Sequence, residues 1–215
     1  MSSQGERVIS TDEMTGIQAL ERKAPDKPMR PGKPTKREFE YIRHGTQTLI
    51  ASFDVSQGKI AHETIGQTRT EVDFAAHLKS MIRAAPNVKK WHLIMDCLNT
   101  HQSESLVRWV ASIEGIPTVT LGKKGVSGIL QSMATRAQFL SNREHFIVFH
   151  YTPKHSSWLN QIEIWFSILM RKLLKRSSFL SQGDLAAKIL DFIAYYNDKM
   201  AKPFKWTYKG KALTA

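Results

Sequence analysis

Residues 91–95, WHLIM, constrain the fold more than any other stretch of this sequence. They form an apolar run of strand length, which is the pattern of a strand buried on both faces. Because helices cover both faces of a sheet with such strands, the run favours an α/β architecture. The next residue is Asp96, so we expect a carboxylate at the end of a buried strand.

Strand and helix patterns alternate around this run. Strands are predicted at 7–12, 46–55, 59–65, 117–121 and 146–150, and helices at 70–85, 106–113, 157–175 and 183–196. Residues 14–18 are predicted to be a loop, residues 56–58 a hairpin turn, and Ser156 or Ser157 the cap of the helix that follows. Since parallel strands need long crossovers, usually helical, this order predicts a mixed sheet with helices on both faces.

Two segments interrupt the alternation. Residues 21–43 alternate charge with proline and are rich in Lys and Arg. Proline removes the N–H donors that a β-ladder needs, so we expect an extended basic arm on the surface or along a bound polyanion. Residues 122–145 carry three early glycines, and we expect a flexible insertion over one end of the sheet. No Gly-Lys-Ser/Thr follows these glycines, which argues against a nucleotide P-loop.

The charge of the chain points to a polyanionic partner. Its 31 Lys and Arg against 19 Asp and Glu give a net charge of +12, which attracts nucleic acid over long range. The sequence contains no run of 18 apolar residues, so it gives no indication of a membrane-spanning helix. A single cysteine, Cys97, excludes an intramolecular disulfide and a thiolate-rich zinc site.

Three acids are placed where strands end. Asp12 and Asp96 close predicted strands, and Glu163 lies in the helix that follows the last strand. The ends of such strands form a common crevice, and a few convergent carboxylates suit Mg²⁺. Two such ions can activate an attacking oxygen and stabilise a leaving one in phosphoryl transfer. A solvated surface position is the simpler interpretation of Glu163 taken alone.

Other polar residues give weaker signals. Asn160 and Ser167 share the helical side of Glu163, so Asn160 is expected to orient Glu163 or to contact DNA. Asn99 and His101 are candidate supporting residues or contacts to the scissile phosphate, and Asn99 is alternatively a helix cap. A zinc site is the alternative suggested by four histidines: His92, His101, His150 and His155.

Several motifs, taken in their order along the chain, resemble those of bacterial insertion-sequence transposases of the mariner-related DDE group. The matching motifs are Ser10-Thr11-Asp12-Glu13, Ile17-Gln18-Ala19-Leu20, Asp96 with Asn99-Thr100-His101, Thr152-Pro153, Ser157-Trp158-Leu159-Asn160-Gln161, Glu163-Ile164-Trp165-Phe166 and Pro203-Phe204-Lys205-Trp206-Thr207. The resemblance covers nearly the whole chain. It implies a ribonuclease-H-like fold in which Asp12, Asp96 and Glu163 bind metal.

The resemblance also implies a function. It implies Mg²⁺- or Mn²⁺-dependent cleavage of double-stranded DNA at transposon ends, followed by strand transfer to a target, with TA as the expected step. A homodimer and a location in the bacterial cytoplasm, with the nucleoid, follow from the same resemblance. A silent DNA-binding remnant and a structure-selective nuclease of the same fold are the alternatives.

DNA contacts are expected from basic residues on the arm and on the last helical turns before residue 177. These residues are Lys33, Lys36, Arg37, Arg43, Arg171, Lys172, Lys175 and Arg176. Trp158 and Trp165 are expected in the core, and Trp206 and Tyr208 either pack on the domain or stack on bases.

The sequence departs from the family pattern in two ways. Only eleven residues precede Asp12, so we expect one catalytic domain, residues 1–215, without the helix-turn-helix modules typical of the group. Between Asp96 and Glu163 lie 66 residues, more than is usual in the group, and the surplus corresponds to residues 122–145.

Overall fold

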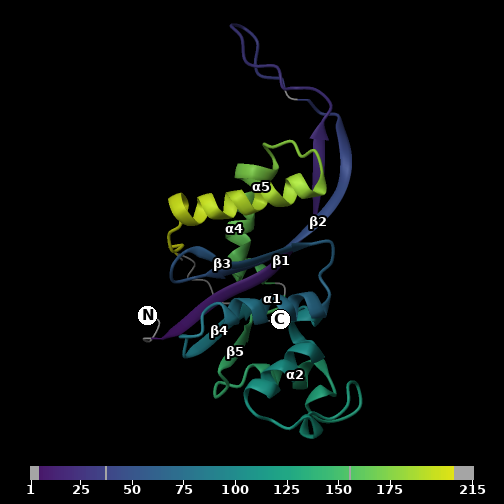
Figure 1. Ribbon diagram of the computed structural model, residues 1–215, viewed down its shortest axis with the longest axis vertical. Helices are drawn as coiled ribbons and strands as arrows, with labels where there is room; N and C mark the ends of the chain where they lie inside the picture. Colours follow the sequence, from purple (N-terminus) through teal and green to yellow (C-terminus); the bar gives the residue numbers. More distant parts are fainter. Residues whose placement is uncertain (1–4, 37, 155, 206–215) are drawn as a thin grey trace.

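The computed structural model describes residues 5–36, 38–154 and 156–205. Its centre is one five-stranded sheet with the strand order β3-β2-β1-β4-β5 (Figure 1). The strands are β1 (Glu6–Arg22), β2 (Tyr41–Asp54), β3 (Lys59–Gly66), β4 (Lys90–Met95) and β5 (Ile147–Tyr151). Strands β1, β4 and β5 run parallel, whereas β2 pairs antiparallel with both β1 and β3. The predicted mixed sheet is therefore confirmed.

Five α-helices flank the sheet in the described part of the chain, and in four of them the residue just before the first turn is a side-chain cap. The helices are α1 (Glu71–Arg83), α2 (Glu104–Ile113), α3 (Met133–Leu140), α4 (Ile162–Leu169) and α5 (Gln182–Tyr195). The caps of α1, α2, α3 and α5 are Thr70, Ser103, Ser132 and Ser181, whose hydroxyl oxygens accept backbone N–H groups of the first turn.

The prediction that residues 91–95 are buried on both faces was wrong. Only alternate residues of β4 are completely buried, while His92 and Ile94 on its other face are partly exposed, because α4 and α5 pack on β1–β3 rather than on β4. Trp91, Leu93 and Met95 belong to a core that includes side chains of α1, α2 and α3. A second core on the other face joins β1–β3 to α4 and α5 and includes Phe53 and Trp165. Alternate residues of a strand point to opposite faces, so β1 contributes to both cores.

Strand β1 is much longer than the predicted strand at 7–12. It continues to Arg22 through residues 14–18, where a loop was expected, because β2 supplies a pairing partner along this whole length. Register shifts between Met14 and Ile17 and between Gln18 and Leu20 absorb the irregularity. Asp12 therefore lies within a strand rather than at its end.

The prediction of a strand at 117–121 was wrong. Residues Thr118–Leu121 form a 3-10 turn instead, whose Leu121 is completely buried. The following segment, expected to be a flexible insertion, contributes Leu130 and Leu140 to the larger core and contains α3. The segment lies at one end of the molecule, beside α2 (Figure 1).

Helix α4 begins at Ile162, five residues after the predicted start. Residues Ser157–Leu159 form a 3-10 turn, and no side chain of Ser156 caps it. Asn160 then adopts an extended conformation with ψ 112°, which interrupts the helical path. The helix continues beyond Leu169 as a π-helical turn, Met170–Leu174, a feature often found near functional sites.

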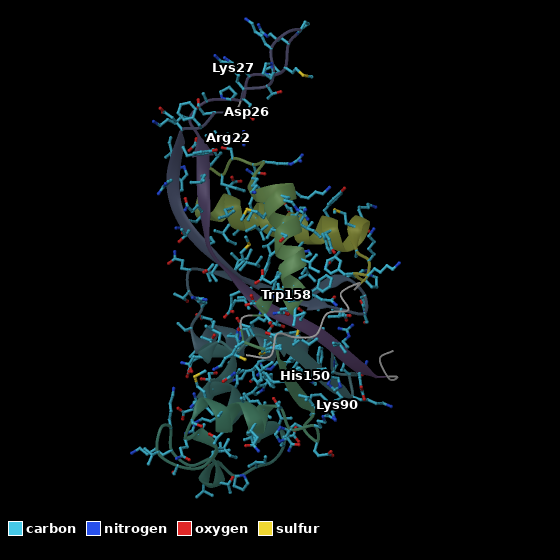
Figure 2. All side chains as sticks on the ribbon, turned by 180° about the vertical axis from the view of Figure 1, so that it is seen from behind. Arg22, Asp26, Lys27, Lys90, His150 and Trp158 are labelled. Carbon is cyan, nitrogen blue, oxygen red and sulfur yellow. The ribbon has the colours of Figure 1, made fainter. Side chains whose placement is uncertain are left out.

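The basic arm leaves the body of the molecule between β1 and β2, at the top of Figure 1. Bridges between Lys27 and Lys36 and between Arg30 and Lys33 hold its two limbs together. At its base Arg22 Nη1 lies 2.5 Å from Asp26 Oδ2, and Figure 2 labels both residues.

The structure confirms only some of the predictions made for the tryptophans and the C-terminal segment. Trp165 is completely buried, as expected, whereas Trp158 is 49% exposed, so its expected place in the core was wrong. Phe204 stacks on Phe53 at 4.8 Å, while Trp206 and Tyr208 lie outside the described residues. Within the described part of the chain, no helix is long and apolar enough to cross a membrane.

Candidate active site

Two of the predicted acids lie at neighbouring points of the sheet. The parallel pairing of β1 with β4 ends at Ser10 and Ile94, and Asp12 and Asp96 each follow two residues later. Glu163 is in the first turn of α4. The charge of Asp96 raises the pKa of both Asp12 and Glu163, behind the larger effect of burial at each. Asp96 therefore lies within electrostatic reach of both Asp12 and Glu163.

Asp12 is the most perturbed of these acids. Burial raises the pKa of its carboxyl group to about 7, with smaller contributions in the same direction from Asp96 and Glu13. The Glu13 N–H, which donates to Asp12 Oδ1 at 2.8 Å, and the charge of His101 act in the opposite direction. Without a further cation, this side chain is a poorly solvated carboxylate.

Asn160 connects β1 to the start of α4. Its Oδ1 accepts the hydroxyl of Ser10, and its Nδ2 donates to the Thr11 carbonyl at 3.0 Å and to Asp12 Oδ2 at 3.3 Å. Ser10 Oγ in turn accepts the N–H of Ile162 at 2.8 Å and so caps α4. The side-chain amide of Asn160 therefore bonds to β1, while its backbone carbonyl accepts the Glu163 N–H at 3.1 Å. The expected role of Asn160 in orienting Glu163 or contacting DNA stays a prediction.

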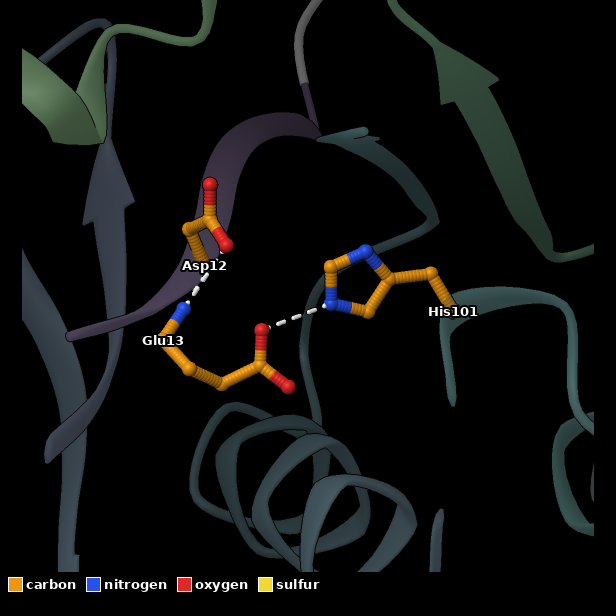
Figure 3. A group of neighbouring side chains, drawn as sticks. All are labelled: Asp12, Glu13 and His101. Atoms are coloured by element: carbon orange, nitrogen blue, oxygen red, sulfur yellow. Dashed lines mark hydrogen bonds and ion pairs between the residues drawn. The ribbon is translucent and has the colours of Figure 1, made fainter. Parts of the chain in front are cut away.

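His101 lies between two carboxylates on the other side of β1. Its Nε2 is 2.9 Å from Glu13 Oε2, and its Nδ1 is 2.7 Å from Asp96 Oδ1. Figure 3 shows the contact with Glu13. Burial alone would lower the pKa of His101, but hydrogen bonds and charge from Asp96 and Glu13 raise it to about 10. Both nitrogens then donate to carboxylates, which only accept.

Glu13 is the site residue that the sequence reasoning missed. Its side chain is 1% exposed and faces His101, whereas the neighbouring Asp12 side chain bonds to Asn160. The missed signal was the two-residue period of a strand, which sends consecutive acids to opposite faces.

Among the described residues, Asp12, Glu13 and His101 form a group with metal-ligand spacing. Their candidate ligand atoms all lie within 4.8 Å of one another. However, both ring nitrogens of His101 already contact carboxylates, so a metal there would have to displace one of them. Asp12, Asp96 and Glu163 are the alternative set. Asp96 contacts His101 through Oδ1, and the charge of His101 also reaches Asp12. Carboxylate oxygens suit Mg²⁺ and Mn²⁺.

An open groove leads away from these acids. Its walls include Glu13, Met14 and Thr15 of β1 and one side of α4 with its π-helical extension, from Glu163 through Ser167 and Arg171 to Lys175. The groove is acidic at one end and basic at the other. A phosphate chain that lies along it could therefore contact cationic side chains while one phosphate is near the carboxylates.

The remaining predicted site residues are spread over two surfaces. Arg171, Lys172, Lys175 and Arg176 are exposed at the end of α4, and Lys33, Lys36 and Arg43 are exposed on the arm and the first part of β2. Arg37 lies outside the described residues. Asn99 is exposed at the start of a 3-10 turn whose preceding residue, Leu98, makes no side-chain cap.

The histidines do not assemble as the zinc alternative requires. His92 Nδ1 and His150 Nε2 are 2.9 Å apart at the β4–β5 edge, and Figure 2 labels His150 there. His101 belongs to the separate Glu13–Asp96 arrangement. His155 lies outside the described residues, and the described histidines form no group of three with metal-ligand spacing.

Comparison with solved structures supports the fold. The Mos1 strand transfer complex superimposes with a TM-score of 0.56 at 14% identity, covering 90% of this chain and 48% of that one. A pre-cleavage Mos1 transpososome gives a TM-score of 0.54 at 14% identity, covering 87% and 48%. The chain thus spans about half the length of these structures, whose catalytic domain has the predicted ribonuclease-H-like fold.

Sequence comparison assigns the family. No curated protein matches the chain. The family described as DDE superfamily endonuclease matches residues 7–186, a segment that includes the three acids and all five strands except the first residue of β1. The chain therefore belongs to the DDE superfamily endonucleases.

Proposed function

We propose that this chain is the catalytic domain of a transposase that cuts DNA at insertion-sequence ends and joins the freed 3′ hydroxyl to a target strand. The observation that carries the proposal is the placement of Asp12 and Asp96 on neighbouring strands, each two residues beyond the last β1–β4 pair, with Glu163 at the acidic end of a groove whose other end is basic. Membership of an endonuclease superfamily and the likeness in fold to Mos1 complexes support it.

The proposed cofactors are two Mg²⁺ or Mn²⁺ ions held by Asp12, Asp96 and Glu163. The raised pKa values of Asp12 and Glu163 fit this assignment. Burial outweighs the charge of His101 at Asp12, and a bound cation would stabilise the charged forms of both carboxylates. When bound, such ions supply activation of the attacking oxygen and stabilisation of the leaving one.

The chain's own residues prepare the site in three ways. Asn160 and the Glu13 N–H orient the two oxygens of Asp12. His101 and the Leu98 N–H, at 2.7 and 2.9 Å, occupy Oδ1 of Asp96 and leave Oδ2 for a ligand. Arg171 and Lys175 face the groove, where they would hold backbone phosphates on either side of the scissile one.

Double-stranded DNA is the proposed partner, both as transposon end and as target. The net charge of +12 and the exposed arm lysines support it. We further propose that the target step is TA and that two copies of the chain act together, on the strength of the family resemblance. Sequencing of joined products tests the first point, and the mass of the chain bound to paired ends tests the second.

The decisive test is nicking and strand joining of supercoiled DNA with Mg²⁺ or Mn²⁺. The wild-type chain is compared with Glu163→Gln and with the control Glu144→Gln, which changes an exposed glutamate in the turn before β5. We expect nicked and joined products from the wild type and the control, and neither from Glu163→Gln.

Two other results would contradict the proposal. Cleavage without joined products would identify a nuclease of the same fold. Firm DNA binding without metal-dependent cleavage, even on DNA that carries the cognate ends, would identify a silent DNA-binding remnant.

A further inference from the structure

Glu13 is an acid next to a proposed metal ligand, yet its side chain does not join the ligands. Glu13 pairs with Ile50, which belongs to the core under α1–α3, whereas Asp12 pairs with Ala51, which belongs to the core under α4 and α5. The side chain of Glu13 accordingly lies on the α1 side, 1% exposed. A buried carboxylate in this position needs a specific partner.

That partner is His101, which is itself held from several sides. Its ring lies against Phe74, with centroids 4.4 Å apart, and its backbone carbonyl accepts the Tyr151 hydroxyl at 2.9 Å. With Glu13 on Nε2 and Asp96 on Nδ1, the imidazole has little freedom to rotate. Its fully buried position excludes water as a substitute partner.

The same contact fixes Asp96. Its Oδ1 receives two hydrogen bonds, one from His101 Nδ1 and one from the Leu98 N–H. Two donors on one oxygen fix the plane of the carboxylate, and they leave that oxygen occupied by hydrogen bonds. The side chain is otherwise 31% exposed after the end of β4, so these two bonds are what distinguish one orientation from the others.

We propose that Glu13, acting through His101, is a positioning residue that holds Asp96 with Oδ2 presented to the metal. This inference rests on the proposed function. Partners of ligands in such outer positions orient the ligand and tune affinity, and their loss commonly lowers metal affinity by about 10–100-fold. Glu13 would thereby link β1 to the ligand that follows β4.

The test measures Mn²⁺ binding by the full chain without DNA, using titration calorimetry, together with thermal unfolding. We expect Glu13→Ala to weaken Mn²⁺ binding by about 10-fold or more. Glu13→Gln, whose amide oxygen still accepts from His101, should stay within about threefold of the wild type. His77→Gln serves as a control for general destabilisation, since His77 is a buried histidine that contacts Ser52 and Thr64.

A matched pair at His101 keeps the test informative if Glu13→Ala does not fold. Both substitutions remove the ring from Phe74. In His101→Asn the amide N–H₂ occupies the region of Nδ1 and retains the donor to Asp96, whereas in His101→Gln it reaches toward Glu13 instead. We expect the Gln variant to bind Mn²⁺ more weakly than the Asn variant.

The outcomes separate this inference from the proposed function. Wild-type affinity in a folded Glu13→Ala chain, or equal affinities of the two His101 variants, would overturn the positioning role alone. A wild-type chain that binds no Mn²⁺ would overturn the metal site itself and the positioning role with it.

Discussion

Strand β1 places two consecutive acids, Asp12 and Glu13, on opposite sides of the sheet, and the partners of the acids differ between the two sides. On the α1 side, Glu13 and one oxygen of Asp96 are matched by the buried cation of His101. On the α4 side, burial raises the pKa values of Asp12 and Glu163, and at Asp12 it outweighs the charge of His101. One side is closed and neutralised, while the other keeps negative charge for a ligand from outside.

The comparison teaches where a bound cation belongs. An acid that is already paired with a cation of the protein stabilises the structure of the site. An acid whose charge is not balanced by the protein is available to bind a cation from solution. Spacing of ligand atoms alone would select Asp12 together with Glu13 and His101 of the closed side, because their ligand atoms lie within 4.8 Å of one another. The distribution of charge instead favours metal binding on the open side.

The largest effect is expected from removing one of the three proposed metal ligands. Asp96→Asn should reduce metal-dependent cleavage by at least about 10³-fold, because a ligand charge is lost at the reacting phosphate. DNA affinity, measured by fluorescence anisotropy, should change little. Asp191→Asn, on the exposed side of α5, is the control. Equal loss of cleavage and DNA binding in a folded variant would remove the distinction between the sides.

A second prediction concerns the amide that holds the open side together. Asn160→Ala should lower the free energy of unfolding by about 2–4 kcal/mol, because it leaves the Ser10 hydroxyl and the Thr11 carbonyl with fewer partners in the interior. Urea denaturation provides the measurement. The exposed Asn142→Ala should cost less than about 0.5 kcal/mol, and a comparably small cost at Asn160 would show that this network is dispensable.

The pH dependence of the metal-free chain sharpens the contrast. Asp12 and His101 have raised pKa values, about 7 and about 10, so each contributes stability that is lost as the pH rises through its folded value. Burial lowers the pKa of His77 to about 3, which costs stability below its ordinary value. Stability should therefore be greatest at slightly acidic pH.

Between pH 6 and 8 the Asp12 contribution should fall by about 1 kcal/mol. Urea denaturation in EDTA checks this value. Asp12→Asn should remove this part of the slope, and the part from His101 should remain. A metal-free stability that stays flat or rises over this interval would contradict the charge assignment on both sides.

The smallest effect is expected at the basic end of the groove. Arg171→Gln and Lys175→Gln should each reduce the slope of log affinity against log salt by about 1, since each removes one phosphate contact. Arg83→Gln, at the end of α1 and exposed, should leave the slope unchanged. If the three variants behave alike, the groove is not the path of the DNA.

Local sequence patterns predicted most of the fold. Apolar runs and capping residues gave β4, β5, α1 and α5 closely, because each depends on its own residues and immediate neighbours. The extension of β1 through residues 14–18 depends on pairing with β2, which no local pattern reveals. Residues 117–121 have strand-like composition but no strand partner in the sheet.

The site divides in the same way. Strand ends and a helix start identified Asp12, Asp96 and Glu163 as candidates. The contacts of Asn160 with Ser10 and Asp12 join residues about 150 positions apart, and the sequence order of the motifs does not encode them. His101 was recognised as a supporting residue, but its partner Glu13 required the geometry of the strand.

The most direct test of the account is the position of Mn²⁺ in crystals of the full chain, located by anomalous diffraction. We predict a peak in contact with Asp96 Oδ2 and with the carboxylates of Asp12 and Glu163, while His101 keeps both of its carboxylate partners. A peak between Glu13 and His101, with the His101 contacts broken, would contradict the assignment of metal binding to the open side.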